Sequence, residues 1–366
     1  MGTAVVVLVA AGVVAWRVTG AEREEPLRSV AAGVGAVFTD LPAELRPPAE
    51  VTDLPTDRAA GQGVLIYHRY IDVTSYDPDS RSFDQNDIYL VTRTGAQFRI
   101  GRTPKDPGPL NLSLSPDGRW LGARRDGRWR VRDLSGTAEY EVTVGYELSH
   151  WSTDARSVLL VGPSADGRAF ATMALPGGDV RPLDLRLANL STEVAFVVGR
   201  ELAVFDGYPW ADQSGTQELT VTLKDVHRSV NRRLTVIGPG QLRPGEALGP
   251  LIALWRAGGN PPSIWMEVGQ TDLVPTDSPE GSLVLPSVAL LGVDVTSGAP
   301  LGRIELTSTN VDGRQLCVGV VAEGVVLQRW TASATELIVV DPRRGTRRVV
   351  TRFPENVNVL VPGARL

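Results

Sequence analysis

Leu112-Ser113-Leu114-Ser115-Pro116-Asp117-Gly118-Arg119-Trp120-Leu121 is the stretch that decides the fold. Its two apolar ends are separated by a Ser-Pro-Asp-Gly segment, whose proline and glycine favour a tight turn. The next apolar stretch ends in Asp133-Leu134-Ser135-Gly136, which indicates a further hairpin. A weaker copy begins at Leu148 and reads Leu-Ser-His-Trp-Ser-Thr-Asp-Ala-Arg-Ser-Val-Leu. The sequence therefore predicts strands joined by short hairpins, repeated along the chain.

The same alternation of apolar runs and turn residues continues from Gly63 to the end of the chain. Almost no segment repeats its apolar residues at a helical period, so we expect no helix after the N-terminal segment. Repeated four-stranded units of about 40–45 residues are typical of β-propeller blades. We therefore predict an all-β fold in which residues 61–366 form a closed β-propeller of about six to seven four-stranded blades, with seven favoured. The strand at residues 357–361 is expected to complete the first blade.

Composition and charge narrow the classes of function. Apolar residues make up 42% of the 366 residues, which is enough for a packed core. The formal net charge of −5 argues against a nucleic-acid partner, because phosphate binding requires an excess of basic side chains. Cys317 is the single cysteine, so no disulfide forms within the chain.

The N-terminal residues form the most hydrophobic segment. Thr3 to Trp16 contains only apolar or small residues and is followed by Arg17. About 14 helical residues span ~21 Å, which is less than the ~30 Å hydrocarbon core of a bilayer. An interfacial Trp16 and a snorkelling Arg17 extend this length, so we predict a transmembrane anchor or signal segment at residues 1–20. An uncleaved anchor is the preferred interpretation, and a cleaved export signal or a buried hydrophobic element are the alternatives.

Residues 21–60 contain several prolines, which favour extended and semi-rigid chain. We therefore predict a stalk or linker between the anchor and the propeller. Within it, residues 30–38 are apolar enough to dock on the propeller.

The chain from about residue 63 to residue 366 resembles the WD40-like, TolB-type β-propeller proteins of actinobacteria. Ser115-Pro116-Asp117-Gly118-Arg119 matches the blade motif of that family, and Trp151-Ser152-Thr153-Asp154-Ala155 matches it with alanine in place of the usual glycine. No blade carries the complete Gly-His and Trp-Asp pair of eukaryotic WD40 repeats. The resemblance implies an exported or membrane-tethered propeller, without known catalysis in most members. It thereby implies a single-pass protein of the cell membrane with an extracytoplasmic propeller, whereas the basic residues that follow the segment, Arg17, Arg23 and Arg28, favour the opposite orientation by the positive-inside rule.

The residues that suggest chemistry fit structural roles better. Asp117 precedes a glycine in a hairpin turn. One loop contains four aspartates: Asp77, Asp79, Asp84 and Asp87. Arg81 and Ser82 stand where a regular calcium loop needs an oxygen ligand and a glycine. The chain has three histidines, none at the spacing of a metal site: His68, His150 and His227. We find no G-x-S-x-G motif and no phosphate-binding loop, so we predict no catalytic residue, no cofactor and no metal.

The candidate interaction surface combines arginines and loop aromatic residues. A hairpin near the C-terminus carries four arginines: Arg343, Arg344, Arg347 and Arg348. Alternating arginines on a hairpin ordinarily face water, and the functional interpretation is a docking patch for anionic lipid headgroups or cell-envelope polymers. Tyr208 and Trp210 lie in a predicted loop, where Trp210 either anchors a partner or packs under its own loop.

These predictions favour a non-enzymatic, membrane-tethered β-propeller that acts as a binding or scaffold module for a protein or a cell-envelope polymer. The alternative is an exported propeller enzyme, such as a lyase or a glycosidase, with carboxylates converging on the central channel. Paired carboxylates about 5–9 Å apart at the channel favour the enzyme, whereas apolar or arginine side chains favour the binding module.

Overall fold

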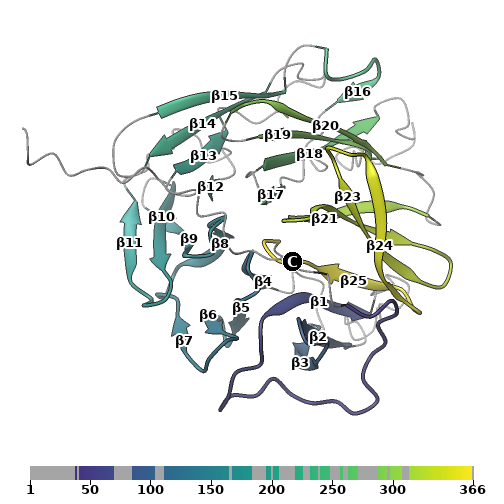
Figure 1. Ribbon diagram of the computed structural model, residues 1–366. Helices are drawn as coiled ribbons and strands as arrows, with labels where there is room; N and C mark the ends of the chain where they lie inside the picture. Colours follow the sequence, from purple (N-terminus) through teal and green to yellow (C-terminus); the bar gives the residue numbers. More distant parts are fainter. Residues whose placement is uncertain are drawn as a thin grey trace, which may run out of the picture. The chain divides into compact units, whose positions relative to one another are not determined.

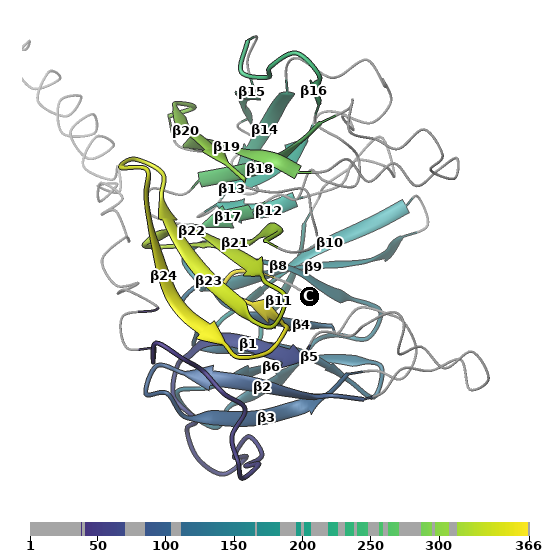
Figure 2. The ribbon, with the colours of Figure 1, turned by 90° about the vertical axis from the view of Figure 1, so that its right-hand side faces the viewer.

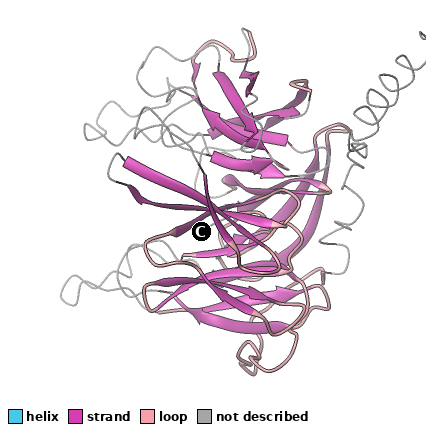
Figure 3. Cartoon of the chain, turned by 90° about the vertical axis from the view of Figure 1, so that its left-hand side faces the viewer, coloured by secondary structure: helices cyan, strands magenta, loops and turns pink. Residues whose placement is uncertain are grey.

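The computed structural model describes residue 38 and residues 41–69, 85–103, 111–164, 167–183, 195–198, 201–205, 219–225, 231–237, 240–247, 256–258, 263–270, 287–294, 297–306 and 313–364. The chain divides into Met1–Gly33 and Val34–Leu366, and every described residue belongs to the second unit. The described residues form strands and loops (Figure 3). Within these ranges no helix has the length and apolar character needed to span a bilayer. The anchor predicted at residues 1–20 lies outside the described residues.

Six antiparallel sheets are found among the described residues (Figure 1). In spatial order, the first sheet contains β25 (Val357–Leu360), β1 (Gly63–Arg69), β2 (Asp87–Thr92) and β3 (Gln97–Arg102). The second contains β4 (Leu112–Leu114), β5 (Trp120–Arg125), β6 (Arg128–Asp133) and β7 (Glu139–Glu141). The third contains β8 (Glu147–Trp151), β9 (Ser157–Ser164), β10 (Gly167–Ala174) and β11 (Val180–Leu183).

The remaining sheets follow the same plan. The fourth contains β12 (Ala195–Val198), β13 (Glu201–Phe205), β14 (Leu219–Asp225) and β15 (Asn231–Ile237). In the fifth, β16 (Glu246–Ala247) and β17 (Arg256–Gly258) both pair with β18 (Ser263–Gln270), which is followed by β19 (Ser287–Asp294) and β20 (Pro300–Glu305). The sixth contains β21 (Gln315–Val321), β22 (Gly324–Trp330), β23 (Thr335–Asp341) and β24 (Thr346–Phe353).

Consecutive sheets contact one another, and the sixth sheet contacts the first through β21 and β25. In Figure 1 the first strands β4, β8, β12 and β21 lie nearest the centre, and the last strands β7, β11, β15 and β24 lie at the periphery. Hydrophobic side chains fill the spaces between sheets, as where Trp129 and Trp151 join the second sheet to the third. This arrangement confirms the predicted all-β propeller. Because several intervening segments lie outside the described residues, the total of six to seven blades stays a prediction.

The first sheet is completed by the C-terminal strand β25. It pairs antiparallel with β1, and Val359 lies opposite Tyr67. Tyr67 stacks on Tyr89 with ring centroids 5.3 Å apart, and its ring centroid lies 5.1 Å from that of Phe353 in β24. The two ends of the propeller chain therefore share one hydrophobic core. The predicted pairing of residues 357–361 with the start of the propeller is confirmed.

The residues that precede β1 pack along the outer strands of the sheets. The Leu45 amide donates to the Arg352 carbonyl at 2.8 Å, and the Leu54 amide donates to the Arg99 carbonyl at 3.0 Å. These contacts cover parts of the open edges of β24 and β3, which otherwise offer unpaired backbone groups to another chain.

The expected stalk at residues 21–60 thus includes a segment that is packed against the propeller. Phe38 is 1% exposed and Leu45 is 2% exposed, and both lie in the core shared by the first and sixth sheets. Docking was predicted for residues 30–38 and is confirmed at Phe38, while the rest of that range lies outside the described residues.

The Ser-Pro-Asp-Gly turn between β4 and β5 is held by side-chain hydrogen bonds. Ser115 Oγ donates to Asp117 Oδ1 at 2.6 Å, and the same oxygen accepts the Arg119 amide at 3.0 Å. In the third sheet, Ser152 Oγ donates to Asp154 Oδ1 at 2.6 Å, which repeats the arrangement. Asp117 is therefore a turn residue, as predicted.

Candidate binding surface

The four predicted arginines lie on the hairpin formed by β23 and β24. Asp341 Oδ1 accepts the backbone amides of Arg343 at 2.9 Å and Arg344 at 3.3 Å, an arrangement by which aspartate favours a turn. Gly345 completes the turn with a φ of 65°, a value that glycine adopts without steric cost. The sequence therefore folds locally into a tight turn on which Arg343 and Arg344 are exposed.

Arg347 and Arg348 lie on opposite faces of β24. Arg347 pairs with Val340, which packs in the core between the fifth and sixth sheets. Arg348 pairs with Val339, which packs in the core between the sixth and first sheets. Because side chains alternate along a strand, the two arginines point towards different neighbouring sheets. The structure therefore brings the four arginines to one hairpin and does not gather them on one face.

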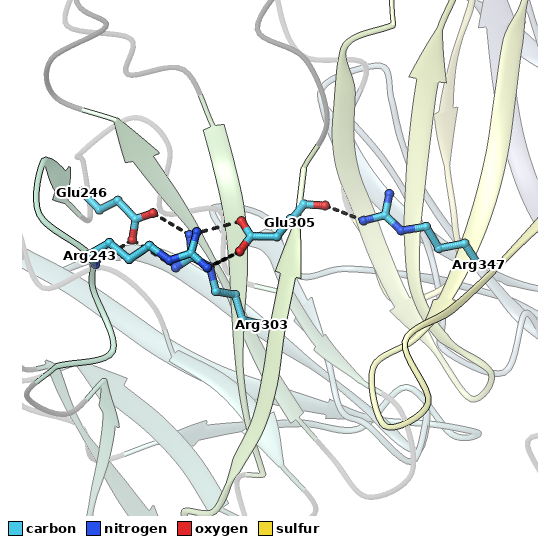
Figure 4. Close-up of polar contacts among 5 residues, drawn as sticks. All are labelled: Arg243, Glu246, Arg303, Glu305 and Arg347. Atoms are coloured by element: carbon cyan, nitrogen blue, oxygen red, sulfur yellow. Dashed lines mark hydrogen bonds and ion pairs between the residues drawn. The ribbon is translucent and has the colours of Figure 1, made fainter.

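Two of the four arginines have partners. The Arg347 guanidinium donates to the backbone carbonyl of Glu305 in the edge strand β20 (Figure 4). Arg344 Nε lies 3.7 Å from Asp341 Oδ2, and this pair is largely exposed, so it adds little stability. The side chains of Arg343 and Arg348 have no hydrogen-bond or ion-pair partner among the described residues. These two cations are therefore available to a ligand.

An ion-pair network lies next to Arg347 (Figure 4). Arg303 Nη2 lies 2.5 Å from Glu246 Oε1, and Arg303 Nε lies 2.9 Å from Glu305 Oε1. Arg243 Nη2 reaches Glu305 Oε1 at 2.5 Å. The Glu246 side chain is 4% exposed and that of Arg303 is 16% exposed, so the centre of the network is shielded from water.

The network favours the charged forms of its members. Burial raises the pKa of Glu246, but hydrogen bonds from the Arg303 side chain and the Arg243 amide outweigh it, so the net pKa is lower than usual. The pKa of Glu305 is lowered for the same reasons, with burial opposed by Arg303 and Arg243. Burial lowers the pKa of Arg303, but the two carboxylates raise it overall. The network therefore links strands of the fifth sheet, and its carboxylates and guanidinium groups favour their charged forms.

A pocket of about 170 Å³ opens beside the hairpin turn. Its lining includes Trp265 and Leu301 from the fifth sheet, and Glu323 and Arg343 from the sixth. Glu323 Oε1 accepts the Phe38 amide at 3.1 Å, and Glu323 Oε2 is buried without a hydrogen-bond partner among the described residues. The pocket thus combines an apolar wall with one cation, Arg343, and two carboxylates, Glu323 and Asp341.

Several residues singled out in the sequence cannot be placed on this surface. The following lie outside the described residues: Tyr208, Trp210, Asp77, Asp79, Asp84 and His227. The fourth aspartate of that loop, Asp87, accepts from Arg102 at 3.0 Å. The role predicted for Tyr208 and Trp210 therefore stays a prediction.

Sequence reasoning missed the network at the fifth sheet. Glu246 and Arg303 are 57 positions apart, and no local spacing joins them. They meet because β16 and β20 belong to the same sheet. The alternation of Arg303 and Glu305 along one strand was the only local signal.

Acidic side chains on the innermost strands bear on the enzyme alternative. Among the described residues the strands nearest the centre in Figure 1 carry one acid, Glu147 of β8, and its Oε1 lies 3.2 Å from Arg124 Nη2. Among all the residues that the structure describes, no group of three or more His, Cys, Asp and Glu side chains could hold a metal ion.

The fold and this surface define a β-propeller with an arginine-bearing hairpin. Comparisons with known proteins show similarity in fold alone. No family model matches the chain, and no curated protein is similar to it in sequence. TolB from Acinetobacter baumannii is 15% identical with a TM-score of 0.44, and the match covers 83% of this chain and 65% of TolB. TolB-type β-propeller proteins are therefore among the solved structures that this chain is similar to.

Two enzymes are also similar in structure. An oligogalacturonate lyase in complex with manganese is 12% identical with a TM-score of 0.40, and the match covers 83% of this chain and 86% of the lyase. The acylaminoacyl peptidase of Pyrococcus horikoshii is 16% identical with a TM-score of 0.42, covering 81% of this chain and 51% of the peptidase. Because one fold hosts many functions, these likenesses assign no activity to this chain.

Proposed function

We propose that the protein is a non-enzymatic, membrane-tethered β-propeller that acts as a binding or scaffold module for a protein or a cell-envelope ligand. The observation that carries the proposal is the β23–β24 hairpin, on which Arg343 and Arg348 are exposed and have no partner among the described residues. Exposed guanidinium groups on a rigid hairpin suit the recognition of anionic groups. The arginine partner of Glu147 is further support, since this acid of the central strand β8 already serves as an ion-pair partner.

The tether is tested by fractionation. Full-length protein is expected to sediment with membranes and to resist carbonate extraction, because Thr3 to Trp16 buries apolar side chains in the bilayer. Val7→Arg places a charge in this segment at a cost of about 2.5 kcal/mol or more, so this variant should move to the soluble fraction. Val7→Leu is the matched control and should stay in the membrane.

The state of the propeller is followed by tryptophan fluorescence and circular dichroism. A soluble Val7→Arg protein with a folded propeller supports the tether. A soluble wild-type protein, or a propeller that unfolds in Val7→Arg, would refute it, since the segment would then belong to the core.

The binding role is tested by affinity capture from native membranes. The wild type should enrich a ligand that the Arg343→Gln/Arg348→Gln double variant does not retain. Equal recovery by both proteins would remove the hairpin from the binding surface.

A further inference from the structure

We infer that the tip of the β23–β24 hairpin, residues 341–348, docks on anionic phospholipid headgroups of the bilayer that holds the N-terminal segment. The inference rests on the tether of the proposed function and names the partner of its binding surface. The tip carries four arginines against one aspartate, whereas the whole chain has a net charge of −5. The tip is therefore a local concentration of positive charge in an acidic protein, which suits an anionic surface.

The tip is exposed on both faces of β24. Every residue from 343 to 349 is exposed, and Figure 2 shows the turn of this hairpin at the margin of the ribbon. Val349 follows the arginines and is 50% exposed, whereas the other exposed valines among the described residues, Val51 and Val144, lie outside the strands. In the proposed contact the cations meet lipid phosphates, and Val349 lies at the headgroup boundary.

The tip lies at the end of the sixth sheet that Phe38 contacts. In an antiparallel four-stranded sheet, the turn between the first two strands and the turn between the last two lie at the same end of the sheet. The turn at Glu323 therefore lies beside the turn at Arg343, and both residues line the pocket described above. Glu323 also accepts the backbone amide of Phe38, so the first described residue of the chain is held at this end of the sheet.

The distance to the bilayer is limited by the chain. Residues 21–37 separate the predicted anchor from Phe38, and even fully extended they span at most about 60 Å. A short tether makes docking an intramolecular event with an effective concentration in the millimolar range. Individually weak contacts between the tip and the bilayer are then sufficient.

The two unpartnered arginines carry most of the expected affinity. Arg343 and Arg348 give up no ion pair on docking, because they have none among the described residues. Each guanidinium presents a planar fork that matches phosphate oxygens. A basic residue close to an anionic leaflet strengthens association by about fivefold, so the two together contribute about 25-fold.

The test uses the full chain reconstituted into vesicles of phosphatidylcholine, alone or with added phosphatidylglycerol. Thr346→Cys carries a fluorophore, since Thr346 is exposed and Cys317 is 1% exposed and therefore unreactive. Energy transfer to a headgroup-labelled lipid reports how close the tip lies to the bilayer. Transfer should rise with phosphatidylglycerol and fall at high salt, because salt screens exposed charges. The Arg343→Gln/Arg348→Gln variant should lose the phosphatidylglycerol-dependent part.

The matched control is Arg125→Gln/Arg314→Gln. These two arginines are also exposed and have no side-chain partner among the described residues. They lie at the end of a sheet opposite to the one that carries the first turn: Arg125 precedes the β5–β6 turn of the second sheet, and Arg314 precedes β21 of the sixth. This variant removes the same charge and should keep the wild-type transfer. An equal loss in both double variants would overturn the assignment to the tip.

Flotation with phosphatidylcholine vesicles reports the tether alone. Protein that floats but shows no phosphatidylglycerol-dependent energy transfer refutes the hairpin contact and still supports the tether. Protein that does not float refutes both.

Discussion

The Gln328 side-chain amide donates to the carbonyl of Val357 at 2.7 Å, and its oxygen accepts the amide of Val359 at 3.0 Å. Gln328 belongs to the sixth sheet, whereas Val357 and Val359 belong to β25 in the first. A strand that pairs with a neighbour on one side leaves a row of unpaired groups on the other. The buried glutamine takes the place of a second neighbouring strand, so it fastens the closing strand to the sheet that precedes it in the chain.

We predict that Gln328→Leu destabilises the propeller by about 1–3 kcal/mol, because the Val359 amide is left buried without an acceptor. The Val357 carbonyl keeps the Trp330 indole N–H at 3.2 Å, so only one group loses its partner. Urea unfolding measures the change, and hydrogen exchange at the Val359 amide locates it.

Removing the whole closing strand should destabilise the propeller more than Gln328→Leu does. Deleting residues 356–366 removes β25 and exposes the edge of β1, so the melting temperature should fall further and the protein should aggregate. A truncated protein as stable as the wild type would show that closure by β25 does not hold the ring.

Closure was predictable from sequence, but the group that secures it was not. The apolar alternation of residues 357–361 marks a strand, and a propeller offers a C-terminal strand one place in the first blade. Gln328 is 29 positions from Val357, and its neighbours in the sequence read as an ordinary buried strand. A partner that is set by the packing of two sheets leaves no local pattern.

The arginine hairpin shows the same limit in the candidate site. Spacing placed Arg343, Arg344, Arg347 and Arg348 on one hairpin, which the structure confirms. Whether each side chain is free depends on the neighbouring sheet. Arg347 is occupied because the edge carbonyl of Glu305 lies within its reach, whereas Arg348 faces the other side of β24.

The equivalent turn positions Gly118 and Ala155 should respond to substitution with opposite signs. Their φ angles are 72° and 56°. Gly118→Ala would place its Cβ 1.9 Å from the Gly63 carbonyl oxygen, so the backbone must shift and stability should fall by more than about 1 kcal/mol. Ala155→Gly relieves a left-handed conformation that costs an alanine roughly 1–2 kcal/mol, partly offset by the chain entropy of glycine, so a modest gain is expected.

Denaturant unfolding of the two single variants measures both effects. A loss of stability in Ala155→Gly would mean that the left-handed conformation carries no strain at this turn.

His68 should make the stability of the propeller sensitive to mild acid. It lies in β1 and is 3% exposed. Burial lowers its pKa, partly opposed by the hydrogen bond that Nδ1 makes with the Arg69 carbonyl. Because the folded pKa is below the unfolded value of about 6.5, the unfolded chain takes up the proton first as the pH falls. Stability is therefore complete above pH ~6.5 and declines below it, by about 1.4 kcal/mol for each unit of pKa difference.

The slope of the unfolding free energy between neutral pH and the onset of carboxylate titration measures this contribution. His68→Gln removes the titrating group, so its slope in this window should be flatter than that of the wild type, whatever the substitution costs at neutral pH. An identical slope in the two proteins would assign the acid sensitivity to other groups.

Two ion pairs of equal length should contribute differently to stability, because one is buried and the other is exposed. Arg303 lies 2.5 Å from Glu246 with side chains 16% and 4% exposed, and Arg46 lies 2.5 Å from Glu44 with side chains 72% and 45% exposed. Arg303→Met leaves the Glu246 carboxylate buried without its main partner, so a loss of about 3–5 kcal/mol is expected, and adding Glu246→Leu should recover much of it. The same cycle at Arg46 and Glu44 should yield a coupling of no more than about 1 kcal/mol, because water and salt screen that pair.

The pH dependence gives an independent reading of the same pair. The pKa of Glu246 is lowered in the folded protein, because the hydrogen bonds from Arg303 and the Arg243 amide outweigh the effect of burial. Its contribution is therefore complete above the ordinary glutamate value of 4.5 and is lost as the pH falls below it. The wild type should lose stability more steeply in this acid range than the Arg303→Met/Glu246→Leu double variant. Equal acid slopes, together with equal coupling energies for the buried and exposed pairs, would show that the fifth sheet does not depend on this network.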